Sequence, residues 1–373
     1  FFGILLNKFK KYKKIILTCS IVYNLSILCF FKYFSFILFN IQRFIHLFIP
    51  RFYIEIPEIV LPIGISFFTF QIMSYVIDLY RNEIKVQKSF INLGLYIMLF
   101  PQLIAGPIVR YIDVEKEIYK RNTKIDDIDN GLKRFIIGLG KKVIIANTMG
   151  SWADYVFDLS WDKLNTPVAW LGICSYTLQI YFDFSGYSDM AIGLGRIFGF
   201  HFLENFNYPY ISQSIQEFWK RWHMSLSQWF RDYLYIPLGG NRRGKLKMYL
   251  NSFIVFFCTG LWHGAAWNFI FWGLFHGMFL IIEKIGFGDI LKRIPRIFRH
   301  IYTLLVVIIG WVFFRAETFT MALRYLKQLF IFDFNKLEYF FLGLDNWKIF
   351  MGMCAVIFSL PSAQFIKKYL KRN

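Results

Sequence analysis

Six stretches of this chain carry no Asp, Glu, Lys or Arg and approach the length needed to cross a lipid bilayer. A transmembrane helix needs about 20 mostly apolar residues to cover roughly 30 Å of hydrocarbon. By this rule each stretch predicts one crossing, although the last of them is short. They are residues 15–31, 59–77, 89–109, 164–182, 349–366 and, as the short one, 301–314.

The longest uncharged stretch, residues 248–282, is too long for one straight crossing. As a single helix at 1.5 Å per residue it would extend about 52 Å, well beyond a bilayer core. Glycine tolerates backbone conformations that other residues avoid, so we predict a break near Gly260 and Gly264. Such a break places His263 near membrane depth.

Clusters of Lys and Arg separate the apolar stretches and indicate the orientation of the chain. Because loops rich in these residues stay in the cytoplasm, a cytoplasmic position is predicted for residues 8–14, 220–247, 284–299 and 367–372. Residues 151–165 carry more Asp than Lys and are predicted to lie outside. No internal repeat or linker divides the chain, so we predict one all-α, polytopic integral membrane domain over residues 1–373.

The composition also favours a membrane protein over a water-soluble enzyme. Apolar residues make up 56% of the chain and aromatic residues 21%, and charged residues reach only 18%, against about 25% in soluble domains. The net charge of +19 suits loops facing anionic lipid better than it suits nucleic-acid binding. The five cysteines are scattered without a CxxC pair, so neither a zinc site nor a disulfide framework is predicted.

Motifs of several soluble enzyme classes are absent. The sequence contains no Walker A motif, no GxSxG and no HExxH, which excludes P-loop ATPases, α/β-hydrolases and zincins. No histidine is followed five positions later by Asp, the arrangement used by one class of glycerolipid acyltransferases. Any chemistry must therefore come from residues within or beside the apolar stretches.

The strongest candidate for chemistry is His263, in the segment Gly-Leu-Trp-His-Gly-Ala-Ala-Trp-Asn that covers residues 260–268. An ionisable residue inside an apolar run is costly and indicates function, and histidine can accept a proton from a substrate hydroxyl. A helix after Gly264 would align Gly264, Asn268, Trp272 and His276 on one stripe, which could line a polar slot. The alternative is that His263 only hydrogen-bonds a backbone carbonyl, and for His276 we favour such a structural role.

A second candidate is His223, in a predicted amphipathic helix that begins after Ser214 and ends before Pro237. Trp222, Leu226, Trp229 and Tyr233 share its apolar face, which predicts a helix at the cytoplasmic interface. His223 either joins the site of His263 or lies among lipid headgroups, and the sequence leaves both open. Three basic residues are candidates for binding the phosphates of an anionic donor, although positive-inside bias alone also accounts for them: Arg221, Arg231 and Arg242.

A third candidate is the pair of carboxylates Asp183 and Asp189, which follow an uncharged stretch. Buried acids need partners. They either pair with a helix end or orient a catalytic histidine, and we favour the structural role.

Five segments are similar to the membrane-bound O-acyltransferase family, in particular to its branch that O-acetylates alginate. The segments are residues 61–81, 99–110, 181–200, 205–244 and 259–277. The resemblance implies a multi-helix bundle around a central tunnel, with His263 catalytic and His223 as a second histidine. Trp262 and Asn268 are then expected to line the tunnel or support it. Family members begin with further hydrophobic helices, so we expect the whole protein to contain additional helices before Phe1.

The resemblance also implies a donor, partners and a location. It indicates no bound cofactor, acetyl-CoA as the acyl donor and an extracytoplasmic acetyltransferase or hydrolase-like partner protein. The acceptor would be a polysaccharide such as an alginate-like polymer or peptidoglycan, and the location a bacterial inner membrane. We expect no nucleic acid among the partners.

The reaction is predicted as direct transfer, with His263 as general base on an acceptor hydroxyl. A two-step route through a serine, such as Ser225 or Ser227, or through a tyrosine stays open. Two other functions are alternatives: D-alanyl transfer to teichoic acid, and transport of a lipid-linked sugar without covalent chemistry. A transporter would be expected to contain internal repeats, which this sequence lacks.

Overall fold

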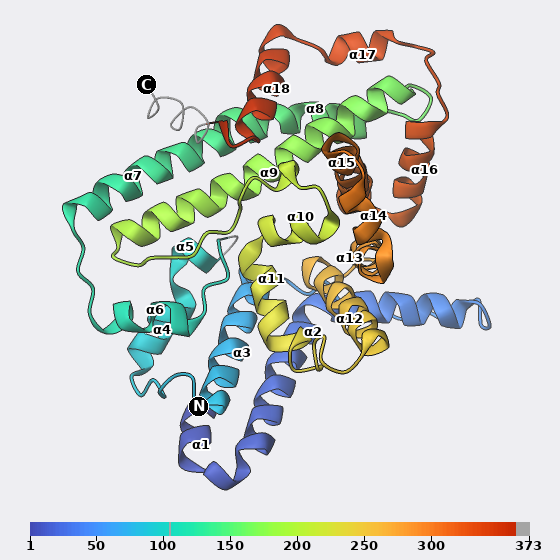
Figure 1. Ribbon diagram of the computed structural model, residues 1–373. Helices are drawn as coiled ribbons and strands as arrows, with labels where there is room; N and C mark the ends of the chain where they lie inside the picture. Colours follow the sequence, from blue (N-terminus) through green and yellow to red (C-terminus); the bar gives the residue numbers. More distant parts are fainter. Residues whose placement is uncertain (104–105, 363–373) are drawn as a thin grey trace.

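The computed structural model describes residues 1–103 and 106–362, and it confirms the predicted all-α class (Figure 1). No strand occurs in the part of the chain that it describes. The α-helices of the first half are α1 (Phe2–Lys8), α2 (Lys13–His46), α3 (Ile65–Arg81), α4 (Phe90–Met98), α5 (Phe100–Leu103), α6 (Tyr111–Tyr119), α7 (Ile125–Gly140), α8 (Asn147–Phe157) and α9 (Thr166–Ile197). Those of the second half are α10 (Ile215–Arg221), α11 (Met224–Phe230), α12 (Lys245–His263), α13 (Trp267–Ile282), α14 (Gly288–Arg293), α15 (Arg296–Arg315), α16 (Phe319–Phe330), α17 (Glu338–Gly343) and α18 (Asn346–Phe358).

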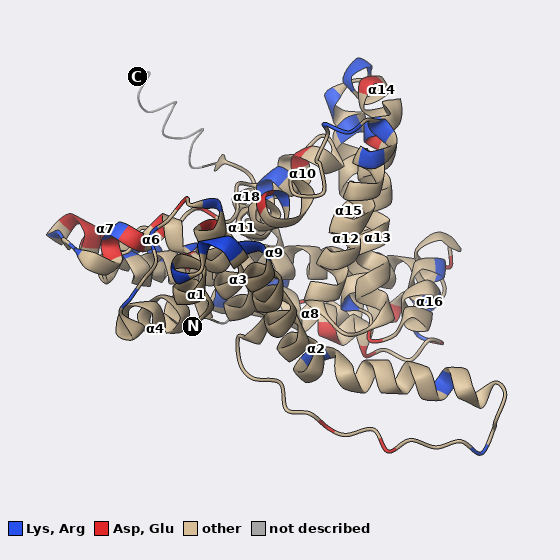
Figure 2. Ribbon diagram, turned by 90° about the horizontal axis from the view of Figure 1, so that it is seen from below, with Lys and Arg blue, Asp and Glu red and all other residues tan. Residues whose placement is uncertain are grey.

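Within the described residues, three helical segments are long and apolar enough to cross a membrane: Lys10–His46, Trp267–Arg293 and Arg296–Arg315. They contain the predicted stretches 15–31 and 301–314 and the second half of 248–282. In Figure 2 the ribbons of α12, α13 and α15 carry few charges along their length, and basic residues gather around α14. The predicted basic cluster at 367–372 lies outside the described residues.

The predicted break in residues 248–282 is confirmed, because α12 ends at His263 and α13 begins at Trp267. The two helices then run back against each other at very short range. A Cβ atom on Gly273 would lie only 2.3 Å from the carbonyl oxygen of Phe256. Small residues allow helix backbones to approach this closely in membranes. The glycines therefore permit the close packing of α12 against α13.

The predicted single crossing at residues 89–109 is wrong. This stretch forms the short helices α4 and α5, and Leu99 between them has an extended backbone. Pro101 lacks the N–H that would continue the hydrogen bonding of α4.

The predicted continuous helix from Ser214 to Pro237 is also only partly correct. It begins as expected, because the Ser214 side chain accepts the N–H of Glu217 at 3.0 Å. It then breaks at Trp222 and His223 into α10 and α11, followed by a π-helical turn at Arg231–Tyr235. The apolar face packs inside the protein, with Trp222 and Leu226 only 3% and 2% exposed, so this segment is no interfacial helix.

The break has a tertiary cause. The loop at residues 205–207 supplies hydrogen bonds that an unbroken helix would make internally. The N–H of Asn207 donates to the carbonyl of Arg221 at 2.9 Å, and the N–H of Met224 donates to the carbonyl of Asn205 at 2.9 Å. The main-chain groups on both sides of His223 are therefore satisfied by another segment.

Candidate functional site

His263 is the last residue of α12, directly before the break. Its ring lies edge-on to three aromatic rings, with centroid distances of 5.0 Å to Trp262, 4.8 Å to Trp272 and 5.2 Å to Phe314. The site of His263 is thus formed by residues of α12, α13 and α15. Its imidazole is held by packing at the point where the hairpin turns.

His223 reaches the same region from the break between α10 and α11. Its backbone has φ +42° and ψ +56°, a left-handed conformation that costs energy outside glycine and is concentrated at functional sites. The residue is 1% exposed, so it does not lie among lipid headgroups. Its ring is 6.0 Å from Trp262, edge to face. The indole of Trp262 therefore contacts both histidines.

Asn205 is the polar partner of His223. The His223 Nδ1 atom lies 3.2 Å from the Asn205 Oδ1 atom. The other ring nitrogen, Nε2, is buried and has no hydrogen-bond partner in the described chain. His223 is thus anchored through one nitrogen and has the other available for chemistry.

Two consecutive residues of α2 bind the end of α12 beside His263. The Tyr33 hydroxyl donates to the carbonyl of Leu261, and the Lys32 ammonium donates to the carbonyl of Trp262. Lys32 also donates to the Ser66 hydroxyl at 3.1 Å. The last carbonyl groups of a helix have no partner inside it and favour a nearby positive charge, so Lys32 and Tyr33 stabilise this terminus.

The predicted stripe along α13 exists, but it is no polar slot. Asn268, Trp272 and His276 are all buried, at 4%, 1% and 0% exposure. Asn268 donates to the carbonyl of Ala316 at 2.8 Å and so binds the end of α15. Both ring nitrogens of His276 lack a hydrogen-bond partner in the described residues, and aromatic rings surround it. Asn268 therefore binds the end of α15, and its role in lining or supporting a tunnel stays a prediction.

The two candidate carboxylates join helices instead of orienting a histidine. Asp183 pairs with Lys142. Asp189 binds Arg134 at 2.8 Å and Lys141 at 2.7 Å. These contacts link α9 to α7 and its π-helical extension, which agrees with the structural role favoured from the sequence.

The three candidate donor-binding arginines have different surroundings. Arg221 is occupied by Glu217 at 2.9 Å and by the carbonyl of Asn207 at 3.1 Å. Arg231 pairs with its neighbour Asp232 at 2.7 Å. Arg242 is exposed. None of the hydrogen bonds within the described residues joins these side chains to His223 or His263, so their role in donor binding stays a prediction.

A cavity of about 1130 Å³ is lined by Asn205 and Met224, the partner and the chain neighbour of His223. It is bordered by α9, by the extension of α7, by α18 and by the loop before α10. Residues on its wall include Arg134, Lys141, Tyr181, Ser188, Asn205 and Met224. The cavity therefore extends from a charged region to the residue that binds His223.

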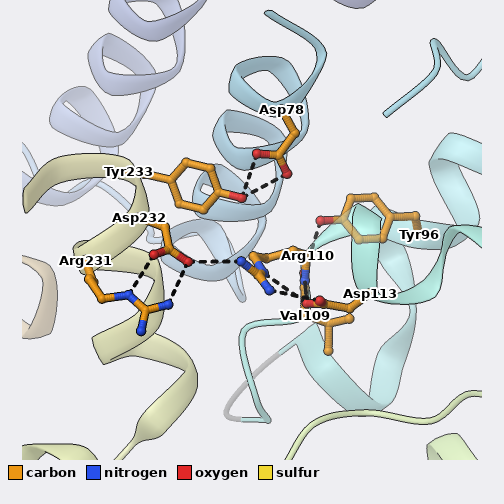
Figure 3. Close-up of polar contacts among 8 residues, drawn as sticks. All are labelled: Asp78, Tyr96, Val109, Arg110, Asp113, Arg231, Asp232 and Tyr233. Atoms are coloured by element: carbon orange, nitrogen blue, oxygen red, sulfur yellow. Dashed lines mark hydrogen bonds and ion pairs between the residues drawn. The ribbon is translucent and has the colours of Figure 1, made fainter. Parts of the chain in front are cut away.

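A charged network holds α11 and its π-helical turn in place (Figure 3). Arg110 contacts Asp113 at 3.0 Å and Asp232 at 3.1 Å. The Tyr233 hydroxyl donates to both oxygens of the fully buried Asp78 at 2.9 Å. Since Arg110 and Asp78 lie far from residues 231–235 in sequence, this network fixes the segment that follows His223.

Sequence reasoning missed Asn205, Lys32 and Tyr33. Lys32 carried a usable signal, because it is a charged residue within a long apolar helix. Asn205 is polar and lies in a loop, where no periodicity singles it out.

Comparison with known proteins identifies the family of this chain. The pattern of the membrane-bound O-acyltransferase family matches residues 10–326. The "probable alginate O-acetylase" of Pseudomonas aeruginosa is 46% identical over 316 residues, covering 85% of this chain and 60% of that protein. The peptidoglycan O-acetyltransferase of Helicobacter pylori is 39% identical over 349 residues, covering 85% of this chain and 65% of that protein.

A more distant relative is the teichoic acid D-alanyltransferase of Bacillus subtilis, 33% identical over 229 residues and covering 58% of each chain. The chain thus spans 60% and 65% of the length of the first two relatives. Because the family pattern covers residues 10–326, which is most of the sequence, this chain belongs to the membrane-bound O-acyltransferase family.

Proposed function

We propose that this protein is a membrane O-acetyltransferase that takes acetyl groups from cytoplasmic acetyl-CoA for O-acetylation of a polysaccharide. The acceptor would be an alginate-like polymer or peptidoglycan, the substrates named for the relatives from Pseudomonas aeruginosa and Helicobacter pylori. One observation carries the proposal: the rings of His223 and His263 both lie against the indole of Trp262, with centroid distances of 6.0 Å and 5.0 Å.

The proposed reaction is an ordinary acyl transfer. His263 accepts the proton of the acceptor hydroxyl as the oxygen attacks the thioester carbonyl carbon. The carbon–sulfur bond breaks, and the proton passes from the imidazole to the leaving thiolate. No cofactor is consumed, and the products are the acetyl ester and the free thiol. His223 would bind one of the reacting groups through Nε2.

Location and partners complete the proposal. Apolar helices place the chain in a membrane, and we propose the bacterial inner membrane, crossed several times with the basic segments 220–247 and 284–299 in the cytoplasm. The cavity beside Asn205 would admit the donor, with Arg134 and Lys141 at its charged region. An extracytoplasmic acetyltransferase or hydrolase-like partner would complete transfer to the polymer.

The test compares the polysaccharides of a deletion strain complemented with full-length wild type, His263→Ala or His276→Phe. Ester-linked groups on the purified polymers are identified by mass spectrometry, and protein levels by immunoblot. We expect acetyl esters with wild type and His276→Phe, and none with His263→Ala or the deletion.

Other outcomes would reject the proposal. Acetylation by an equally abundant His263→Ala protein would remove His263 from the mechanism. Loss of D-alanyl esters instead of acetyl esters would favour D-alanyl transfer, and an unchanged ester content in the deletion strain would favour transport.

A further inference from the structure

Asn205 lies at the centre of a buried hydrogen-bond cluster and is itself 1% exposed. Its Oδ1 atom lies 3.2 Å from the N–H of Ser225, 2.9 Å from the Ser225 hydroxyl and 3.2 Å from His223 Nδ1. Its Nδ2 atom donates to the Ser188 hydroxyl at 3.0 Å. Every polar atom of the side chain therefore has a partner.

The cluster determines which way the Asn205 amide faces. A backbone N–H can only donate, so the atom opposite the Ser225 N–H must be the amide oxygen. The Ser225 hydroxyl accepts the N–H of Ile108 at 2.9 Å and has its own proton to give to Asn205. The hydrogen-bond partners therefore identify which atom of the Asn205 amide is the oxygen and which is the nitrogen.

The amide oxygen in turn determines where His223 carries its proton. An amide oxygen accepts hydrogen bonds only, so His223 Nδ1 must donate to it. With an unprotonated Nδ1, two lone pairs would face each other at 3.2 Å. In neutral His223 the proton therefore lies on Nδ1, and Nε2 has a free lone pair.

We propose that Asn205 is a positioning residue that holds His223 in the Nδ1-protonated form, so that Nε2 acts as a hydrogen-bond acceptor in acetyl transfer. This role rests on the proposed function. His223 Nε2 is buried without a partner in the described residues, while its ring contacts Trp262 beside His263. An acceptor of this kind would bind an N–H or O–H group of a substrate beside the attacking hydroxyl, whose own proton goes to His263.

The first experiment determines the tautomer of His223 and needs no activity assay. Full-length protein with ¹⁵N-labelled histidine is purified in detergent, and the His223 signals are assigned by their loss in His223→Gln. Nitrogen chemical shifts distinguish a protonated from a bare ring nitrogen. We expect the proton on Nδ1 and a bare Nε2, and a proton on Nε2 in the wild type would overturn the proposal.

The second experiment uses matched variants and steady-state acetyl transfer from acetyl-CoA in membrane vesicles. Asn205→Leu removes the acceptor and should lower kcat about 100-fold with little change in KM. Asn205→Asp keeps all three accepted hydrogen bonds, with the Ser188 hydroxyl donating instead, and should retain activity. Asn130→Leu makes the same substitution at an exposed asparagine that only donates to the carbonyl of Asp126, and it serves as the control.

The outcomes separate this role from the proposed function. An inactive wild type would reject the acetyltransferase proposal, while the nitrogen spectra would still decide the tautomer. Wild-type kcat in a folded Asn205→Leu protein would reject the positioning role. If Asn205→Leu does not fold, the wild-type tautomer and the activity of Asn205→Asp decide, and an inactive but folded Asn205→Asp would count against the proposal.

Discussion

Lys32 donates a hydrogen bond to the main-chain carbonyl of Trp262, although 230 positions separate the two residues. Trp262 directly precedes His263, so a cation of α2 binds the terminus of α12 where the candidate catalytic residue lies. The contact connects α2 to the candidate site. Loss of this hydrogen bond should therefore disturb the position of His263 more than it disturbs the rest of the fold.

Lys32→Met should lower acetyl transfer at least about tenfold and stability by about 1–3 kcal/mol, because a buried carbonyl loses its donor. Tyr33→Phe should have a smaller effect, since it leaves the charge of Lys32 in place. Activity per folded protein and thermal unfolding in detergent measure the two effects. Lys13→Met, which loses only an exposed contact to Asn82, is the control. Wild-type activity in Lys32→Met would show that this contact does not position His263.

His276→Phe should leave activity unchanged and should not destabilise the protein. The imidazole is fully buried among aromatic rings, with no partner for either nitrogen in the described residues. Replacing such a group by an apolar one of similar shape is neutral or stabilising. Thermal unfolding and acetyl transfer check this expectation, and a large loss of activity with normal folding would give His276 a chemical role.

Gly310→Ala should destabilise the protein by about 1–3 kcal/mol through overpacking. A Cβ atom at this position would lie 2.5 Å from His276 Nε2. Combining the change with His276→Val should restore most of the stability, because the smaller side chain makes room. Additive effects in the double variant would contradict direct contact between the two positions.

Gly273→Ala should reduce the amount of folded protein in the membrane, with a cost of about 3 kcal/mol. The new methyl group would meet the backbone of α12, and backbone atoms cannot move aside as a side chain can. Gly94→Ala, where no atom lies within 4 Å of the added Cβ, is the matched control and should be tolerated. Equal expression of both variants would show that α12 and α13 are less closely packed.

Tyr233→Phe should destabilise the protein by about 2 kcal/mol, since it leaves the buried Asp78 carboxylate without its hydroxyl donor. Asp78→Asn in the same protein should recover part of the loss, because the uncompensated charge is removed. Thermal unfolding of the single and double variants in detergent gives the coupling between them. A double variant less stable than Tyr233→Phe would show that Asp78 has a further partner.

Local pattern was sufficient to predict several of the apolar helices and the break before Gly264, and it selected His263 and His223 as candidates. Each depends on residues close together in the chain: uncharged runs of a given length, paired glycines and an ionisable group in an apolar setting. The same reasoning failed at residues 89–109, where Pro101 ends a helix within an uncharged stretch.

Tertiary structure alone decided the backbone conformation and hydrogen-bond partner of His223 and the contacts that hold the segment of His263. The break at His223 exists because the loop at Asn205 takes over its main-chain hydrogen bonds. The partners of the two histidine segments, Asn205 and Lys32, are 18 and 230 positions away from the groups they bind. Hydrophobic periodicity reports which face of a helix is buried, but it contains no information about which distant polar group meets that face. The sequence therefore determines the helices and nominates the histidines, and packing between helices determines their hydrogen bonds.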